Sequence, residues 1–267
     1  MNYPPVKLSS PATKEFWEIP VLYEDADLLA LCKPACLLSS PDRYDPLRPN
    51  LMRLLHDGIT AGKPWARERG LTYLMNAHRL DFETSGVMLM AKSKPVLVEL
   101  ANLFGSLKPV KTYVALVHGQ PVTATWTVDA ALAMHPAKVG VMRIDRKQGK
   151  KSITEFETVE VFRGWTLVRC RPLTGRTHQI RVHLQCCGVP ICGDKVYGGH
   201  PLNLSQLKEE YRLKGDKVER PLLSTVALHA ERLELNHPVT QAPVVITAPW
   251  PKDLNVALKF LRRYATR

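Results

Sequence analysis

The chain has 267 residues and a mass of 30.0 kDa, which suits one large domain or two small ones. Apolar residues make up 45% and charged residues 23%, a composition that excludes a disordered chain and a fibrous repeat. The 37 basic residues outnumber the 25 acidic ones and give a net charge of +12. This excess favours a polyanionic partner, most commonly nucleic acid, although a soluble enzyme that merely happens to be basic remains an alternative.

No apolar stretch reaches the ~18 residues of a membrane helix, and the first residues form neither a basic nor an apolar export segment. We therefore expect a cytoplasmic protein that does not bind a membrane. The six cysteines include no CxxC pair, which predicts buried, reduced thiols: Cys32, Cys36, Cys170, Cys186, Cys187 and Cys192. The last three cysteines and His183 could be considered as zinc ligands. They lack the paired CxxC-type spacing of zinc sites, however, and are a poor match to one.

Taken in chain order, residues 1–18 carry several prolines and predict an extended N-terminal arm. Apolar runs around the turn-forming segment 24–27 predict a hairpin within residues 19–38. Apolar spacing and stop signals predict helices at 51–56, 94–104, 177–187, 204–213 and 253–261, the last capped by Asp253. Strands are predicted at 87–91, 112–117, 154–162, 165–170, 228–235 and 244–247. These elements do not alternate regularly, so the predicted fold class is α+β (mixed α/β), with residues 19–267 as one domain.

The first segment with a chemical pattern is HRLDFETSG, residues 78–86, which lies directly before the apolar strand VMLMA. A polar loop at a sheet edge is a common place for catalytic groups. The guanidinium of Arg79 would keep the carboxylate of Asp81 ionised, and an ionised carboxylate can attack an anomeric carbon. The alternatives are that Asp81 caps a turn or pairs with Arg79 for stability, or that Asp81 and Glu83 form a two-carboxylate glycosidase.

The second segment is TGRTHQIRVHL, residues 174–184. Gly175 and Thr177 would present backbone N–H groups at a helix start, an anion site to which Arg176 and His178 add positive charge. His178 and Arg181 are three residues apart and share a helix face, which suits phosphate contact or a cation supplied to a carboxylate. We therefore assign these three basic residues to substrate binding; the alternative is a solvated basic helix end. His183 is expected to be a hydrogen-bonded core histidine.

The third segment is the strand KTYVALV, residues 111–117. Tyr113 can stack on a nucleobase, although a tyrosine in a strand more often belongs to the core. The later segment 193–199, GDKVYGG, has the composition of a turn and is interpreted as structural.

Together these segments resemble the RluA-type pseudouridine synthases. The motifs HRLDFETSG, KTYVALVHG, TGRTHQIRVHL, GVPICGD and LHA follow one another in the order typical of that family. The segments YED and KP near residues 23–34 resemble the family's opening hairpin. The resemblance runs from about Ile19 to the C-terminal helix, and five motifs in order are far more specific than any one of them.

The resemblance implies a pseudouridine synthase catalytic fold with a central, mainly antiparallel sheet flanked by helices and loops. It implies isomerisation of uridine to pseudouridine in structured ribosomal or transfer RNA, without cofactor or metal. Asp81 matches the essential aspartate and Arg79 the arginine that fills the gap left by a flipped base. Tyr113 matches the active-site tyrosine, and Arg181 the basic residue that pairs with the aspartate.

The chain departs from the family pattern at Phe82, where a polar or basic residue is usual, and at Cys32 and Cys36, which replace Asn and Gly. With only about twenty residues before the hairpin, we expect no N-terminal accessory RNA-binding domain, and we expect a monomer. The alternatives are a catalytically idle RNA-binding or ribosome-assembly protein with the same fold, and a hydrolytic glycosidase or nuclease. The complete set of Asp81, Tyr113 and Arg181 favours the enzyme.

Overall fold

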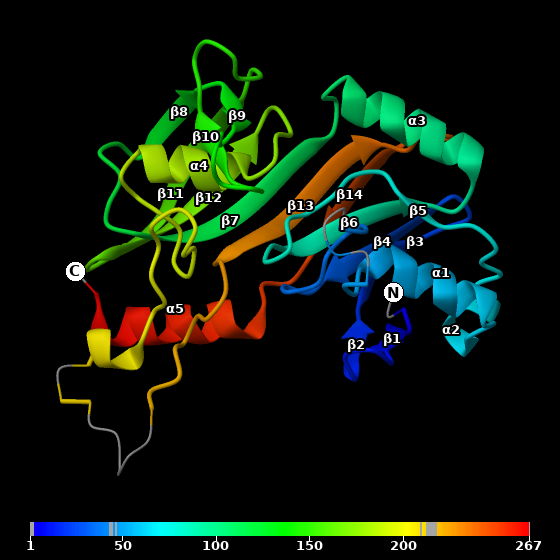
Figure 1. Cartoon of the computed structure of the whole chain (residues 1–267), viewed down its shortest axis with the longest axis horizontal. Helices are drawn as coiled ribbons and strands as arrows, with labels where there is room; N and C mark the ends of the chain where they lie inside the picture. Colours follow the sequence, from blue (N-terminus) through cyan, green and yellow to red (C-terminus); the bar gives the residue numbers. More distant parts are fainter. Residues whose placement is uncertain (1–2, 43–44, 46, 209, 212–217, 267) are drawn as a thin grey trace. The chain divides into compact units, whose positions relative to one another are not determined.

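The computed structural model describes residues 3–42, 45, 47–208, 210–211 and 218–266, which cluster into two compact units (Figure 1). Unit 1 comprises Met1–Val110 and Ala230–Pro249, and unit 2 comprises Lys111–His229 and Trp250–Arg267. Strands and helices occur in both units, which confirms the predicted α+β class. None of the described helices is long and apolar enough to cross a membrane.

The sheet of unit 1 has the strand order β3-β4-β6-β13, with β5 added to β6 and β14 added to β13. The pairs β3–β4, β4–β6, β5–β6 and β13–β14 are antiparallel. The strands of this unit are β1 (Val6–Ser10), β2 (Glu15–Ile19), β3 (Val21–Glu24), β4 (Leu28–Lys33), β5 (Met75–Asn76), β6 (Ser85–Ala91), β13 (Leu228–Asn236) and β14 (Pro243–Thr247). Its helices are α1 (Leu51–Thr60), α2 (Pro64–Arg67) and α3 (Lys94–Gly105).

Both faces of this sheet are covered, because neighbouring residues of β4 and β6 point to opposite sides. Leu29 and Met88 belong to an apolar cluster with α1 and with the hairpin of β1 and β2. Leu28 and Leu89 belong to a second cluster with α3 and β14. The continuous apolar sequence of β6, in which every residue is buried, is the consequence of this double coverage.

Residues 6–19 form a hairpin rather than the extended arm that the prolines suggested. β1 and β2 pair antiparallel from Val6 opposite Ile19 to Ser10 opposite Glu15. Val6 and Leu8 are buried in the core of unit 1, whereas Lys7 between them is exposed. This period of two is the signal of a half-buried strand.

The sheet of unit 2 has the strand order β7-β12-β11-β8, and all three of these pairs are antiparallel. A separate pair is formed by β9 and β10. The strands are β7 (Val110–His118), β8 (Thr125–Asp129), β9 (Leu132–Met134), β10 (Met142–Ile144), β11 (Ile153–Phe162) and β12 (Trp165–Pro172). The helices are α4 (Gln179–Cys186), the 3-10 helix η1 (Leu204–Gln206) and α5 (Lys252–Tyr264), and both α4 and α5 pack on the core of the unit.

Three predicted helices differ in the structure. The helix predicted at 177–187 begins at Gln179, because His178 takes a left-handed conformation with φ 53°. The last helix is capped by Pro251 rather than by Asp253, which lies in its first turn. Of the helix predicted at 204–213, the described part contains η1, and residues 209, 212 and 213 lie outside the described residues.

Candidate active site

Asp81 lies half-buried in the loop between β5 and β6, while the preceding Arg79 is exposed. The backbone next to Asp81 is fixed by Ser39, whose hydroxyl donates to the Leu80 carbonyl at 2.7 Å and accepts from the Leu80 N–H at 3.0 Å. The Asp81 carbonyl accepts from the Thr84 N–H at 3.2 Å and closes a turn. The loop is thus held in one conformation by hydrogen bonds that the polar sequence alone does not reveal.

Lys33 holds the same loop from the end of β4, where its side chain is completely buried. Its ammonium donates to the carbonyls of Pro34 at 2.8 Å, Leu37 at 2.7 Å and Phe82 at 3.3 Å. Burial lowers the pKa of Lys33 to about 7, and the negative charge of Asp81 opposes this shift. The Asp81 carboxylate therefore has a buried cationic group as an electrostatic neighbour.

Phe82, the departure from the family pattern, packs under Arg48, whose guanidinium carbon lies 4.1 Å from the ring centroid. Both neighbours of Asp81 in the chain are therefore contacted by the segment 33–48. The sequence signal for these contacts was the single lysine in the apolar strand LLALCK. A buried lysine requires hydrogen-bond partners, so its presence in such a strand points to contacts elsewhere in the chain.

Gly86 allows β6 to begin directly after this loop. Its φ is 116°, and a Cβ at this position would overlap the carbonyl group of Ala230 in β13. Gly86 lies opposite Lys33 in the pairing of β4 with β6. The glycine that ends HRLDFETSG is therefore required by close packing of backbone.

Arg181 is held by a buried ion pair in unit 2. Its Nε lies 2.6 Å from Oδ2 of Asp194 and its Nη2 lies 2.8 Å from Oδ1, and both side chains are at most 4% exposed. The sequence predicted that Arg181 shares a polar face with His178, but the arginine is buried in the fold. Asp194, which the sequence assigned to a structural turn, is the residue that orients this guanidinium bidentately.

Tyr197 connects Arg181 to His178. The Arg181 guanidinium lies over the Tyr197 ring at 4.9 Å. The Tyr197 hydroxyl accepts from the Met142 N–H at 2.9 Å and lies 2.8 Å from Nδ1 of His178. The Tyr197 hydroxyl therefore links the β10 backbone to the imidazole of His178.

The turn before α4 is built around Gln179. Its Oε1 accepts from the Thr174 hydroxyl at 2.7 Å and from the Arg176 N–H at 3.0 Å. Arg176 is exposed, and its Nε donates to the Lys151 carbonyl at 3.1 Å. The expected donors Gly175 and Thr177 lie in the turn before α4 rather than at its first residue, and the Arg176 N–H between them already has a partner in Gln179.

Tyr113 lies in β7 opposite Cys170 of β12, is half-buried, and packs against the core of unit 2. His183 is a hydrogen-bonded core histidine, as expected, with Nδ1 2.9 Å from the Thr154 hydroxyl and Nε2 3.1 Å from the Ala130 carbonyl. Among the predicted site residues, Asp81 and Arg79 thus belong to unit 1, and the basic residues of 176–181 belong with Tyr113 to unit 2.

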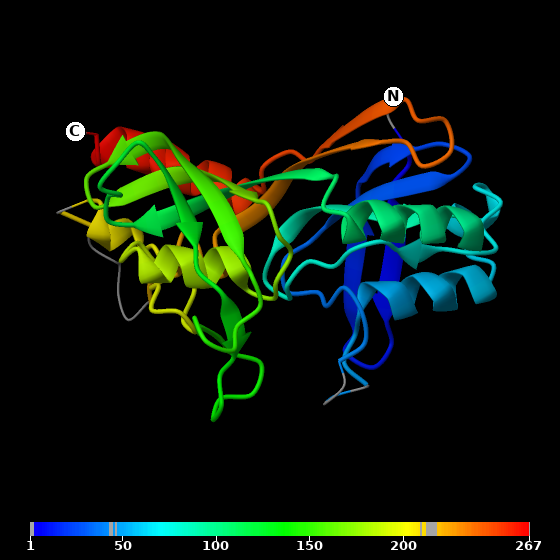
Figure 2. The same cartoon turned by 90° about the horizontal axis from the view of Figure 1, so that it is seen from above.

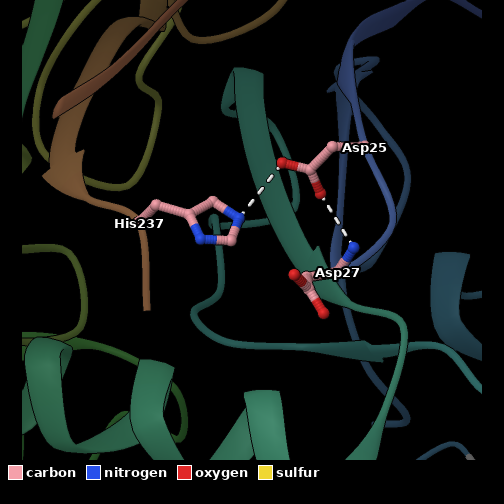
Figure 3. A group of neighbouring side chains, drawn as sticks. All are labelled: Asp25, Asp27 and His237. Atoms are coloured by element: carbon pink, nitrogen blue, oxygen red, sulfur yellow. Dashed lines mark hydrogen bonds and ion pairs between the residues drawn. The ribbon is translucent and has the colours of Figure 1, made fainter. Parts of the chain in front are cut away.

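Among the described residues, one group of Asp and His side chains converges closely enough to be considered for a metal ion: Asp25, Asp27 and His237 (Figure 3). Oδ1 of Asp25 accepts from the N–H groups of Asp27 and Leu28, and its Oδ2 lies 3.1 Å from Nε2 of His237. Nδ1 of His237 accepts from two backbone N–H groups, so Nε2 carries the proton that it donates to Asp25. These donors already satisfy one another, and the group joins the β3–β4 turn to the end of β13.

The zinc site drawn from three cysteines and His183 does not converge. Cys192 is buried, whereas Cys186 and Cys187 are exposed. Both ring nitrogens of His183 have hydrogen-bond partners. The expectation of buried thiols is correct for Cys170 and Cys192 but wrong for three exposed ones, since Cys36 is exposed as well.

An open polar groove of about 580 Å³ lies on the strands β8, β11 and β12. It is lined by Thr125, Trp126, Thr127, Glu155, Phe156, Glu157, Arg169 and Arg171. Arg169 pairs with Glu157 at 2.9 Å, and Arg171 lies opposite Glu155 in the strand pairing. The groove contains none of the predicted site residues, and its charges of opposite sign face each other.

Comparisons with known proteins agree with the site motifs. The family model described as RNA pseudouridylate synthase matches residues 27–186. A protein of Xylella fastidiosa named ribosomal large subunit pseudouridine synthase D is 38% identical over 246 residues, which cover 91% of this chain and 69% of that protein. The protein of the same name from Escherichia coli K12 is 34% identical over 243 residues, covering 91% of this chain and 70% of its own length.

Solved structures show the same fold. The structure titled human RNA pseudouridylate synthase domain containing 4 has a TM-score of 0.66 at 23% identity and covers 91% of this chain and 92% of its own. The human domain containing 1 has a TM-score of 0.62 at 25% identity, with 90% and 87% covered. The chain therefore belongs to the RNA pseudouridylate synthase family and is an isomerase of uridine in RNA.

Proposed function

We propose that this chain converts uridine to pseudouridine in the RNA of the large ribosomal subunit, with Asp81 as the catalytic carboxylate. The assignment of the substrate rests on relatives at 34–38% identity whose names refer to the large ribosomal subunit. They match about nine-tenths of this chain, and the family model matches residues 27–186, which include both segments that hold the candidate residues.

The reaction breaks the N-glycosidic bond of uridine, rotates the detached uracil and joins C5 to the sugar. A proton leaves C5 and N1 gains one, so the reaction balances without a co-reactant. Asp81 acts either as a nucleophile on the sugar or as a base, and both routes need an ionised, oriented carboxylate. The half-buried position of Asp81, in a loop whose backbone is held by Ser39 and Lys33, supports this role.

The target base must leave its stack before the carboxylate can reach the sugar. Arg79 is exposed and available to occupy the place of the flipped base. Tyr113 and Arg181 are assigned to the bound nucleotide, and Arg176 and His178 to the phosphates beside it. We also propose that residues 19–267 act as one catalytic domain, in a monomeric cytoplasmic enzyme.

The test is to map pseudouridine in total RNA from cells with and without the gene. One or more sites in large-subunit RNA should be lost in the deletion strain and restored by the wild-type gene. They should not be restored by a gene that carries Asp81→Asn. Loss of sites confined to transfer RNA would assign a different substrate, and an unchanged map would contradict the proposed activity.

A further inference from the structure

A basic segment outside the recognised motifs is formed by residues 132–151, hereafter the basic hairpin, which contains β9 and β10. It holds six basic residues against one acidic residue, Asp145. The basic residues are Lys138, Arg143, Arg146, Lys147, Lys150 and Lys151. Twenty residues therefore carry five of the twelve net positive charges of the chain.

Asp145 compensates only one cation of this surface, because part of its carboxylate builds a turn. Oδ1 accepts from the N–H groups of Lys147 and Gln148, both at 3.0 Å, and Oδ2 accepts from Arg143 at 2.7 Å. In the part of the chain that the structure describes, no carboxylate pairs with the five other basic side chains of the hairpin, all of which are exposed. The turn thus presents Arg146 and Lys147 as uncompensated cations.

The basic hairpin is fixed to α4 rather than being a loose loop. Leu132 packs with Val182 and Tyr197 in a small apolar cluster, and Met142 and Ile144 pack against that cluster. The Met142 N–H donates to the Tyr197 hydroxyl, which also bonds His178. Figure 1 shows β9 and β10 beside α4, so the hairpin and the His178 side chain share one support.

The charged surface continues into the TGRTHQIRVHL segment. Arg176 bonds the carbonyl of Lys151, the last residue of the hairpin, at 3.1 Å. Exposed cations of the hairpin and of the turn before α4 are therefore neighbours in one unit. A row of exposed Lys and Arg side chains on a fixed support is suited to the phosphates of a nucleic acid.

The other end of the hairpin is apolar. Met134, the last residue of β9, is 61% exposed, and Val139, within the turn between β9 and β10, is 73% exposed. Nδ1 of His135 accepts from the N–H groups of Ala137 and Lys138, which gives this turn a defined shape. In Figure 2 a green loop of this region projects beyond the strands and helices of its unit. Exposed apolar side chains next to cations are suited to contact with bases or ribose.

We propose that the basic hairpin binds RNA, with its basic end on the phosphate backbone that passes Arg176 and its apolar tip against unstacked bases or ribose. The identification of the polyanion as RNA rests on the proposed function. The hairpin would supply RNA affinity in a part of the chain that none of the recognised motifs includes.

The experiment measures binding of the full chain to a fluorescein-labelled RNA stem-loop between about 50 and 200 mM KCl. Arg146→Ala with Lys147→Ala should weaken binding and reduce the slope of log affinity against log salt by about 1.4 to 1.8, which corresponds to two lost phosphate contacts. Lys150→Ala with Lys151→Ala should do the same. The matched control, Lys252→Ala with Lys259→Ala on α5, removes the same charge from an exposed helix and should leave the slope unchanged.

Met134→Ser with Val139→Ser should weaken binding without changing the slope, because no charge is removed. Equal slopes for the hairpin and control variants, or no binding by the wild type, would overturn the proposal. Vesicles of phosphatidylglycerol serve as a second probe; loss of vesicle binding with RNA binding intact would assign the surface to lipid and also overturn it.

Pseudouridine formation on large-subunit RNA is measured with the same wild-type preparation. If the wild type forms pseudouridine and the hairpin variants keep the wild-type slope of log affinity against log salt, the hairpin proposal is refuted and the proposed function stands. The expected slope losses without any product support the hairpin as an RNA-binding surface and refute the proposed function. The two failures are therefore distinguishable.

Discussion

At Asp81 the backbone on both sides is held by side chains from an earlier segment of the chain. Ser39 bonds Leu80, and Lys33 bonds the Phe82 carbonyl. The backbone of the loop is therefore fixed at this aspartate, and Lys33 is an electrostatic neighbour of its carboxylate. These are the conditions that a nucleophile or base on the sugar requires.

We expect Asp81→Asn to abolish turnover while changing RNA affinity by only a few-fold. Asn has nearly the same size and hydrogen-bonding capacity, but it cannot act as an anionic nucleophile or base. The measurement is pseudouridine formation and Kd on the same RNA. Glu83→Gln is the matched control in the same loop and should retain turnover; appreciable activity of Asp81→Asn would remove Asp81 from the catalytic role.

Arg181 is bound by Asp194 through both arms of its guanidinium, so its substitution affects folding as well as function. A lysine keeps the charge but loses the planar fork. We expect Arg181→Lys to lower kcat strongly. Arg176→Ala, at an exposed position, should instead raise Kd and reduce the salt slope by about one.

Asp194→Asn tests the same pair from the other side. Removing one partner of a buried ion pair leaves an uncompensated charge, and we expect a loss of about 3 kcal/mol in the free energy of unfolding. The measurement is denaturant unfolding of each variant, together with kcat and Kd. If Arg181→Lys and Arg176→Ala both lose only affinity, Arg181 is a phosphate-binding residue and its assigned contribution at the active site is wrong.

At the scale of elements, β4 and β6 carry the catalytic loop, and Lys33 is the buried group at their end. Its pKa is lowered from 10.5 to about 7 in the folded protein, mainly by burial. Between these two pKa values the unfolded chain binds a proton that the folded chain lacks. Stability therefore rises with pH across this window, by at most about 1.4 kcal/mol per pH unit from this group.

Lys33→Met removes the titrating group and keeps the length of the side chain. We expect the wild type to gain stability relative to this variant when the pH is raised from 7 towards 10.5. Urea unfolding of both proteins across this pH range measures the difference. A difference that stays constant with pH would mean that Lys33 titrates alike in the folded and unfolded states.

Gly86 and Gly105 offer a contrast between two elements. Gly86 has φ 116° and its Cβ would overlap the Ala230 backbone, so Gly86→Ala should destabilise the protein by about 3 kcal/mol or more. Gly105, at the end of α3, has open space where a Cβ would lie, with no neighbouring atom within 4 Å, so Gly105→Ala should be neutral or stabilise by about 0.5–1 kcal/mol. Thermal unfolding compares them, and equal effects would contradict this account of Gly86.

At the scale of the whole molecule, the reaction is an isomerisation in which the same atoms are present before and after. Its chemistry requires neither an electron acceptor nor a Lewis acid, and the Asp25–His237 group is occupied by its own hydrogen bonds. We expect activity to survive exhaustive treatment with EDTA when spermidine and KCl maintain the RNA fold. Activity that is lost and then restored by zinc or magnesium, with the RNA fold shown to be intact, would contradict this.

The elements that the sequence predicted well are those with a local cause. Strand β6, helix α3 and the hairpin of β11 and β12 lie within two residues of their expected ends. Their apolar periodicity, their N-cap serine or turn glycine and their length all act over a few residues. The strands β8, β9 and β10 were missed because they are only three to five residues long, too short for a clear periodicity, and their pairing partners define them.

The sequence by itself determined the family, the α+β class and the motifs that carry Asp81, Tyr113 and Arg181, because these depend on residue types at fixed spacing. Only the tertiary structure showed that Asp194 holds Arg181 and that Lys33 bonds a carbonyl 49 residues away. Each of these contacts joins residues that the chain separates. A buried charge finds its partner through the fold, which no local pattern encodes.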